Sequence, residues 1–153
     1  MADVKKILCP VDLADPLPLA AEYAGLLARQ SGAGIVVLYV VPDMSLFPNV
    51  NAAPDRTEKF IKLRDSILDG ARRSMDRFIE EYFHGLDVKG EVAVGEIAGE
   101  ILARAEREHA DVIVMGTRGR TGLNAVLFGS VASKIVKSAD CPVITIRPPD
   151  EEL

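Results

Sequence analysis

An uninterrupted apolar run, Ile35–Val41, constrains the fold more than any other feature of the chain. Its sequence, IVVLYVV, is apolar at successive positions, so both faces of the strand that it forms must be buried. A strand buried on both faces is typical of a parallel sheet that helices cover on its two sides. The run therefore predicts a central strand of an α/β sheet.

Strand and helix patterns alternate along the rest of the chain. Asp15 and Pro16 predict the N-cap and first residue of a helix that runs through Leu19, Tyr23, Leu26 and Leu27 to a stop at Gly32. The period-two pattern of Val88–Val94 indicates a less buried strand at a sheet edge. We expect strands at residues 6–11, 35–41, 88–94, 111–115 and 142–147, and helices from Asp15 to Gly32, from Asp55 to about Gly85, from Ile97 to about Glu108 and from Val131 to Lys137.

This order predicts a single domain, residues 1–153, with an α/β fold: an open, doubly wound, five-stranded parallel sheet of strand order 3-2-1-4-5, Rossmann-like, with helices on both faces. In such sheets, ligands bind beyond the carboxyl ends of the strands, where the strand order reverses. Three segments are expected to meet there: Pro10–Asp12, Val40–Val41 and Met115–Gly116.

Residues 42–54 separate the second strand from the long helix. This segment contains three prolines and no periodicity, and its length suggests either a mobile lid or a crossover. It ends at Asp55, which with Glu58 resembles a capping box for the helix that follows.

Composition excludes several classes of protein. The net charge of −5 and the pI of about 5.1 argue against nonspecific nucleic-acid binding, which needs a basic face. No apolar window approaches the roughly 20 residues that a membrane span needs. Two cysteines, Cys9 and Cys141, lie outside any CxxC motif and are expected to be small core residues in a reducing compartment. We therefore expect a cytoplasmic protein without membrane or nucleic-acid partners.

A glycine-spaced segment, Gly116–Gly129, joins the fourth strand to the last helix. Glycines let the backbone approach an anion closely, and a helix N-terminus presents free N–H groups and the positive end of a dipole. Ser130 adds a hydroxyl at the start of the helix. The segment predicts nucleotide or phosphate binding, although glycines that serve only a tight turn would give the same spacing.

The chain is similar to the universal stress protein family at four landmarks in the same order. Gly116-x2-Gly119-x9-Gly129-Ser130 matches the family's G-2x-G-9x-G-(S/T) signature. The other landmarks are Pro10-Val11-Asp12, Leu38-Tyr39-Val40 and Cys141-Pro142-Val143. Because every signature position is kept, the resemblance is to the family members that bind ATP.

The resemblance implies a role for each signature residue. Asp12 would contact the base or ribose, Val40 would meet the adenine, and Gly116 would pass beneath the ribose. Gly119, Gly129, Ser130 and Val131 would wrap the phosphates of ATP, ADP or AMP, and Mg²⁺ or Mn²⁺ would be held through the phosphates. The implied cofactor-binding residues are Pro10, Asp12, Val40, Met115, Gly116, Gly119, Gly129, Ser130 and Val131.

Two arginines of the Gly116–Gly129 segment and the two histidines have no single predicted role in ligand binding. Arg118 and Arg120 could neutralise phosphate charge or could point into solvent. His84 and His109 are expected near helix C-termini, where a cation is favoured, rather than as ligands.

No catalytic residues are predicted. The chain lacks the lysine of the P-loop G-x4-G-K-[ST] and shows no Ser-His-Asp set, so we expect a nucleotide-dependent sensor or regulator rather than a fast enzyme. The resemblance implies that it acts in stress responses. A weak ATP hydrolase and a nucleotide-independent interaction module remain alternatives. The strand Val143–Arg147 is expected at the second sheet edge, where the resemblance implies a homodimer.

Overall fold

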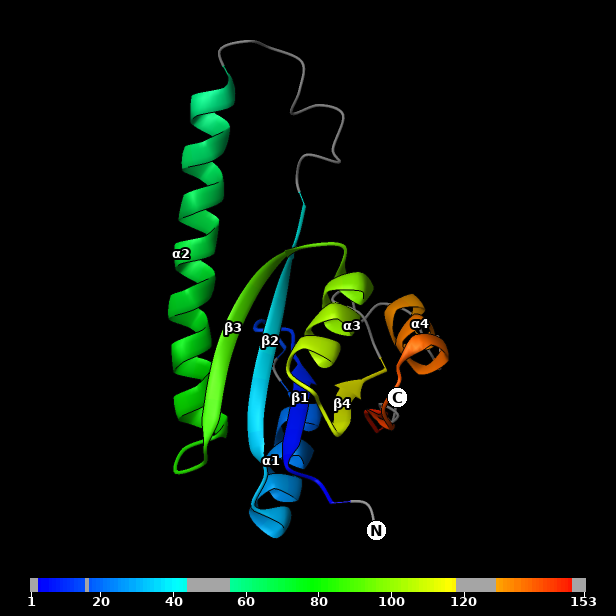
Figure 1. Cartoon of the computed structure of the whole chain (residues 1–153). Helices are drawn as coiled ribbons and strands as arrows, with labels where there is room; N and C mark the ends of the chain where they lie inside the picture. The colour runs from blue at the N-terminus through cyan, green and yellow to red at the C-terminus, as the bar shows by residue number, and fades with distance from the viewer. Residues whose placement is uncertain (1–2, 16, 44–55, 118–128, 150–153) are drawn as a thin grey trace.

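A computed structural model describes residues 3–15, 17–43, 56–117 and 129–149 of the chain (Figure 1). Its core is a five-stranded, all-parallel sheet with strand order β3-β2-β1-β4-β5, which confirms the predicted fold class and order. The strands are β1 (Lys6–Pro10), β2 (Gly34–Pro42), β3 (Val88–Gly95), β4 (Val112–Gly116) and β5 (Val143–Ile146), and the helices are α1 (Leu19–Ser31), α2 (Arg56–Tyr82), α3 (Ile97–Arg107) and α4 (Ser130–Ser138).

Strand β2 is buried on both faces, as its apolar run predicted. Ile35 and Val37 pack with residues of α1 and α2, whereas Val36 and Leu38 pack with residues of α3 and α4 on the opposite face. Alternate side chains of a strand point to opposite faces, so a continuous apolar run supplies both layers of the core. Figure 1 shows α2 and the pair α3–α4 on opposite sides of the sheet.

The start of α1 differs from the prediction. The helix begins at Leu19 after Pro18, and the carboxylate of Asp15 accepts a hydrogen bond from the backbone N–H of Leu17 (2.9 Å) instead of capping the helix. The α conformation is disfavoured for a residue that precedes proline, so Leu17, before Pro18, is a poor position for a helix to continue. The prediction that Asp15 caps this helix was therefore wrong, and Pro16 lies outside the described residues.

The body and end of α1 show how closely the helix lies on the sheet. Its buried residues are small ones, Ala21, Ala24, Gly25 and Ala28, while Tyr23 and Leu26 are 53% and 45% exposed. Small side chains let the helix axis approach the strands closely. The predicted stop at Gly32 is confirmed: Gly32 has φ +75° and its N–H donates to the carbonyl of Ala28 (2.8 Å).

Helix α2 packs tightly on the sheet at one end and extends beyond it at the other (Figure 1). A Cβ added to Gly90 of β3 would lie 2.6 Å from Cγ of Met75 and 2.5 Å from Cδ1 of Ile79, so glycine permits this close approach. The end of α2 at Tyr82, near the predicted His84–Gly85, agrees with the sequence. The capping residue Asp55 and nearly all of the predicted loop lie outside the described residues.

Candidate functional site

The carboxyl ends of β1, β2 and β4 lie side by side and form the C-terminal edge of the sheet. Strand β1 pairs with β2 on one side, with Pro10 opposite Leu38, and with β4 on the other. The N–H of Val11 donates to the carbonyl of Leu38 (2.9 Å) and extends this pairing beyond the end of β1. The chain leaves β1 for α1 on one face and reaches β4 from α3 on the other, so the strand order reverses between β1 and β4.

The structure brings the three predicted segments to this edge. Pro10 ends β1 and Gly116 ends β4, while Val40 and Met115, 3% and 5% exposed, lie at the same ends of β2 and β4. Asp12 follows β1 and is half-buried. The edge therefore has an apolar floor with a carboxylate beside it.

Asp12 is held in a turn of its own. Its Oδ1 accepts a hydrogen bond from the N–H of Ala14 (3.0 Å), and its carbonyl accepts one from the N–H of Asp15 (3.1 Å). Within the described part of the chain, no donor contacts Oδ2 of Asp12. The turn thus fixes the side chain by one oxygen and leaves the other for a ligand group.

Thr117 joins the end of β4 to the start of α4. Its N–H donates to the carbonyl of Ile146 (3.1 Å), and its own carbonyl accepts from the N–H of Gly129 (2.8 Å). Thr117 is 5% exposed, so this junction is buried. The two ends of the glycine-spaced segment are therefore hydrogen-bonded to each other, while Gly119, Arg118 and Arg120 lie outside the described residues.

The N-terminus of α4 carries free backbone donors. Gly129, the N-cap, offers no side-chain cap, and the first helical hydrogen bond runs from the N–H of Ser133 to the carbonyl of Gly129 (3.0 Å). The N–H groups of Ser130, Val131 and Ala132 have no acceptor among the described residues. Together with the helix dipole, such donors attract an anion.

The two described signature glycines have no conformational reason to be glycine. Gly129 has φ −65° and ψ 158°, which any residue adopts, and Gly116 is not among the described glycines with positive φ. A Cβ added to Gly116 would meet, among described atoms, only the carbonyl oxygen of Ile146 at 4.0 Å. Among the described residues, neither a left-handed φ nor a close contact requires glycine at position 116.

An ion pair that the sequence analysis missed connects α3 and α4. The carboxylate of Glu96 caps α3 by accepting the N–H of Gly99 (2.6 Å), and its other oxygen lies 3.4 Å from Nζ of Lys134. The bond from Gly99 lowers the pKa of Glu96, because it favours the charged carboxylate. Lys134 lies one turn after Ser130, so the pair adds a cation near the free donors of α4.

The remaining candidates are the two histidines and the two cysteines. The two histidines follow helix ends as predicted: Nδ1 of His84 is 3.0 Å from Oε1 of exposed Glu80, and His109 follows the end of α3. Cys9 is buried and Cys141 half-buried, and neither forms a disulfide. Across the described ranges, no cluster of three His, Cys, Asp or Glu side chains could hold a metal ion, and no helix is long and apolar enough to span a membrane.

Comparison with known proteins agrees with these features. Residues 3–147 match the universal stress protein family. The chain belongs to that family. It is similar to universal stress protein MJ0531 of Methanocaldococcus jannaschii, with 36% identity over 97% of this chain and 85% of the relative.

Solved structures of universal stress proteins share the fold. The structure of MJ0577, also from M. jannaschii, matches with a TM-score of 0.81 and 26% identity over 97% of this chain and 99% of that one. A universal stress protein from Archaeoglobus fulgidus, solved in complex with dAMP, matches with a TM-score of 0.63 and 20% identity over 95% of this chain and 99% of that one. At 20% identity, the second likeness concerns the fold alone.

Proposed function

We propose that this universal stress protein binds ATP at the carboxyl ends of β1, β2 and β4 and acts as a nucleotide-dependent regulator. The observation that carries the proposal is the pairing of two features at one edge of the sheet. The backbone donors that the N-terminus of α4 offers to phosphate have no acceptor among the described residues, and a Cβ at Gly116 would meet no described atom closer than 4.0 Å. A nucleotide uses both features at once.

The described residues suit the two ends of the ligand. Asp12 offers a carboxylate oxygen to the base or ribose, and Pro10, Val40 and Met115 supply apolar contacts for the adenine. The phosphates would lie against the N–H groups of Ser130 and Val131. Gly119 belongs to the proposed phosphate-binding set through the family signature. Mg²⁺ or Mn²⁺ would be held by phosphate oxygens, because such ions are usually bound by substrate phosphates and only a few protein ligands.

We propose an adenine nucleotide as the ligand class because a universal stress protein with this fold was solved in complex with dAMP. ATP is our choice among adenine nucleotides because the free donors of α4 and the nearby charge of Lys134 suit a chain of several phosphates.

A regulator fits this site better than a fast enzyme. In the described part of α4, Lys134 is paired with Glu96, so its ammonium is held by a carboxylate rather than being available to stabilise a leaving phosphate. Slow hydrolysis remains a second reading, and an interaction module that ignores nucleotide remains a third. The two free thiols, Cys9 and Cys141, suit a reducing compartment such as the cytoplasm.

The test is to denature the purified protein and identify released nucleotide by chromatography. Wild type and a Gly70→Val control on α2 are expected to release stoichiometric adenine nucleotide, while Gly116→Val and Gly129→Val release none. Circular dichroism checks that each variant is folded. A wild type that is empty and also fails to bind added Mg-ATP in calorimetry rejects the proposal in favour of the interaction module.

We also propose a homodimer through β5. The strand is a sheet edge, its Ile144 is 40% exposed, and Val136 on the neighbouring α4 is 47% exposed. An exposed strand edge beside apolar side chains favours pairing with a second copy. In light scattering, Ile144→Glu should give a monomer, whereas Ile61→Glu, on a similarly exposed side chain of α2, should leave a dimer. A wild type that is monomeric at micromolar concentration contradicts this.

A further inference from the structure

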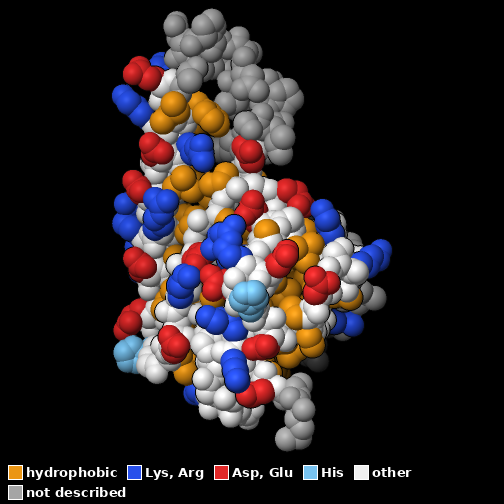
Figure 2. Space-filling view, viewed as in Figure 1, with side chains coloured by type: hydrophobic (Ala, Val, Ile, Leu, Met, Phe, Trp, Pro, Cys, Tyr) orange, Lys and Arg blue, Asp and Glu red, His pale blue; other side chains and the backbone are white. Residues whose placement is uncertain are grey.

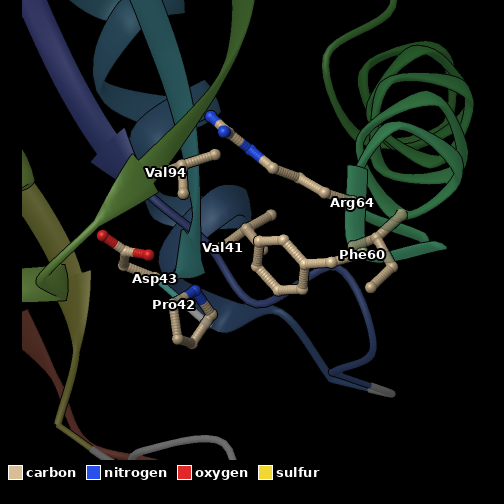
Figure 3. Close-up of a pocket in the computed structure, with 7 residues that line it drawn as sticks. Val41, Pro42, Asp43, Phe60, Arg64 and Val94 are labelled. Atoms are coloured by element: carbon tan, nitrogen blue, oxygen red, sulfur yellow. The ribbon is translucent and has the colours of Figure 1, made fainter. Parts of the chain in front are cut away.

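A pocket lies between α2 and the carboxyl ends of β2 and β3 (Figure 3). Its volume is about 250 Å³. Val41 of β2 and Val94 of β3 lie opposite Phe60 of α2 in Figure 3, and Ile67 of α2 also lines the pocket. The pocket lies at the β3 side of the sheet, whereas the proposed nucleotide site lies where β1 meets β4.

The pocket follows from how α2 packs. Near its C-terminal end, Met75 and Phe78 are 2% and 5% exposed, because Gly90 lets the helix lie directly on β3. Toward the N-terminal end, Phe60 and Ile67 are only half-buried. The helix thus encloses apolar side chains at this end without covering them, and Figure 2 shows apolar surface along this part of α2.

One cation faces this apolar space. The side chain of Arg64 extends from α2 toward the strands, with its guanidinium near Val94 in the view of Figure 3. In the described ranges no carboxylate or other acceptor pairs with Arg64. Two other arginines of the same helix are satisfied within it: Arg72 pairs with Asp69 (3.3 Å) and Arg77 donates to Ser74 (3.3 Å).

We infer that this pocket binds a small anionic amphiphile: a monocarboxylate whose apolar body lies between α2 and the strands and whose carboxylate meets Arg64. A planar guanidinium pairs with a carboxylate through two parallel hydrogen bonds. The volume lies just below the range of about 300–1,000 Å³ that is usual for larger ligands, which favours a compact molecule over a nucleotide. Asp43, on the far side of the pocket from α2, makes the pocket unfavourable for multiply charged anions.

Octanoate is the probe, and its uncharged analogue 1-octanol is the comparison. Methyl NMR spectra of the full chain should show saturable shifts of Val41, Ile67 and Val94 with octanoate, with a Kd on the order of 1 mM. Octanol should bind about fivefold more weakly, because it cannot form the charge-assisted pair at this solvent-exposed arginine. Mg-ATP should not displace octanoate.

Two variants and a matched control test the assignment. Arg64→Gln should weaken octanoate binding about fivefold and leave octanol binding unchanged. Lys62→Gln removes the same charge from an exposed position of the same helix that does not line the pocket, and should bind octanoate as wild type does. Val94→Phe fills the pocket and should abolish binding of both probes.

Three results overturn the inference. The first is no saturable shift with octanoate. The second is equal binding by wild type and Arg64→Gln, which is an informative variant because Arg64 is exposed and its replacement leaves the core intact. The third is displacement by Mg-ATP together with shifts at Val40 and Met115, which would assign octanoate to the nucleotide edge instead.

Discussion

Replacing Gly116 by alanine separates a glycine that the fold requires from one that a ligand requires. The added Cβ would lie 4.0 Å from the carbonyl oxygen of Ile146, an ordinary van der Waals distance, and the backbone φ is not in the left-handed region. The folded state therefore accepts the methyl group. Since alanine restricts the unfolded chain more than glycine does, the free energy of unfolding should rise by about 0.4–1 kcal/mol.

Gly90→Ala is the matched control on another strand. Here the same methyl group would lie 2.5 Å from Cδ1 of Ile79 and 2.6 Å from Cγ of Met75, and Met75 is 2% exposed, so the core has little room to adjust. Overpacking of this kind costs about 1–3 kcal/mol. The two variants should differ in free energy of unfolding by about 2 kcal/mol, although both make the same chemical change.

Urea unfolding, followed by circular dichroism, measures both variants after nucleotide has been removed. Adding Mg-ATP then tests the ligand. At a concentration about 100 times its Kd, a ligand that binds only the folded state adds about 2.7 kcal/mol to the free energy of unfolding. Wild type and Gly90→Ala should gain this stabilisation, whereas Gly116→Ala, with a methyl group in the ligand's space, should gain much less.

A destabilisation of nucleotide-free Gly116→Ala by about 1 kcal/mol or more would contradict this prediction, because glycine would then be required by the fold itself. Full stabilisation of the variant by ATP would also contradict it, since the space beside Gly116 would then not be occupied by nucleotide.

Two further predictions follow from shifted pKa values. Backbone N–H groups of Lys5 and Lys6 donate to Oδ2 of Asp111 (2.8 and 2.9 Å) and lower its pKa. The carboxylate therefore stabilises the fold when the pH is above its ordinary pKa, and this contribution is lost as the pH falls. Asp111→Asn should lower the urea midpoint at pH 7, and the midpoints of the variant and wild type should converge below about pH 4. Burial raises the pKa of Cys9 to about 12, so alkylation at pH 8 followed by mass spectrometry should modify Cys141 in the native protein and Cys9 only after unfolding; modification of native Cys9 would contradict the buried position.

The sheet could be predicted from sequence because its strongest signal is local. Each apolar run is long enough to identify a strand, and the alternation with helices permits few topologies. The start of α1 could not be assigned correctly in the same way. Asp15 followed by Pro16 is a good local start signal, but Pro18 two residues later disfavours helix at Leu17 and moves the start to Leu19. Two competing local signals were present, and the second proved stronger.

The candidate site was predictable as far as a motif reaches. Gly116, Gly129 and Ser130 became candidates because their spacing matches the family signature, and glycine spacing by itself left a plain turn as the alternative. The pairing of Glu96 with Lys134 could not, because the two residues are 38 positions apart and meet only once α3 and α4 pack on the same face of the sheet. A sequence of charged residues on two helices gives no sign of which ones will face each other.

The glycines show most clearly what the folded structure adds to the sequence. Gly32 needs its left-handed φ of +75° to end a helix, and Gly90 needs the absence of a side chain to let α2 approach β3. Among the described residues Gly116 shows neither need, because its φ is not in the left-handed region and an added Cβ meets no described atom closer than 4.0 Å. Gly129, with φ −65° and ψ 158°, has no conformational need for glycine. A glycine that the folded chain does not require lowers stability through the entropy of the unfolded state. The stability of Gly116→Ala is therefore the quantity that decides between the ligand that we propose at this position and a purely structural need for glycine.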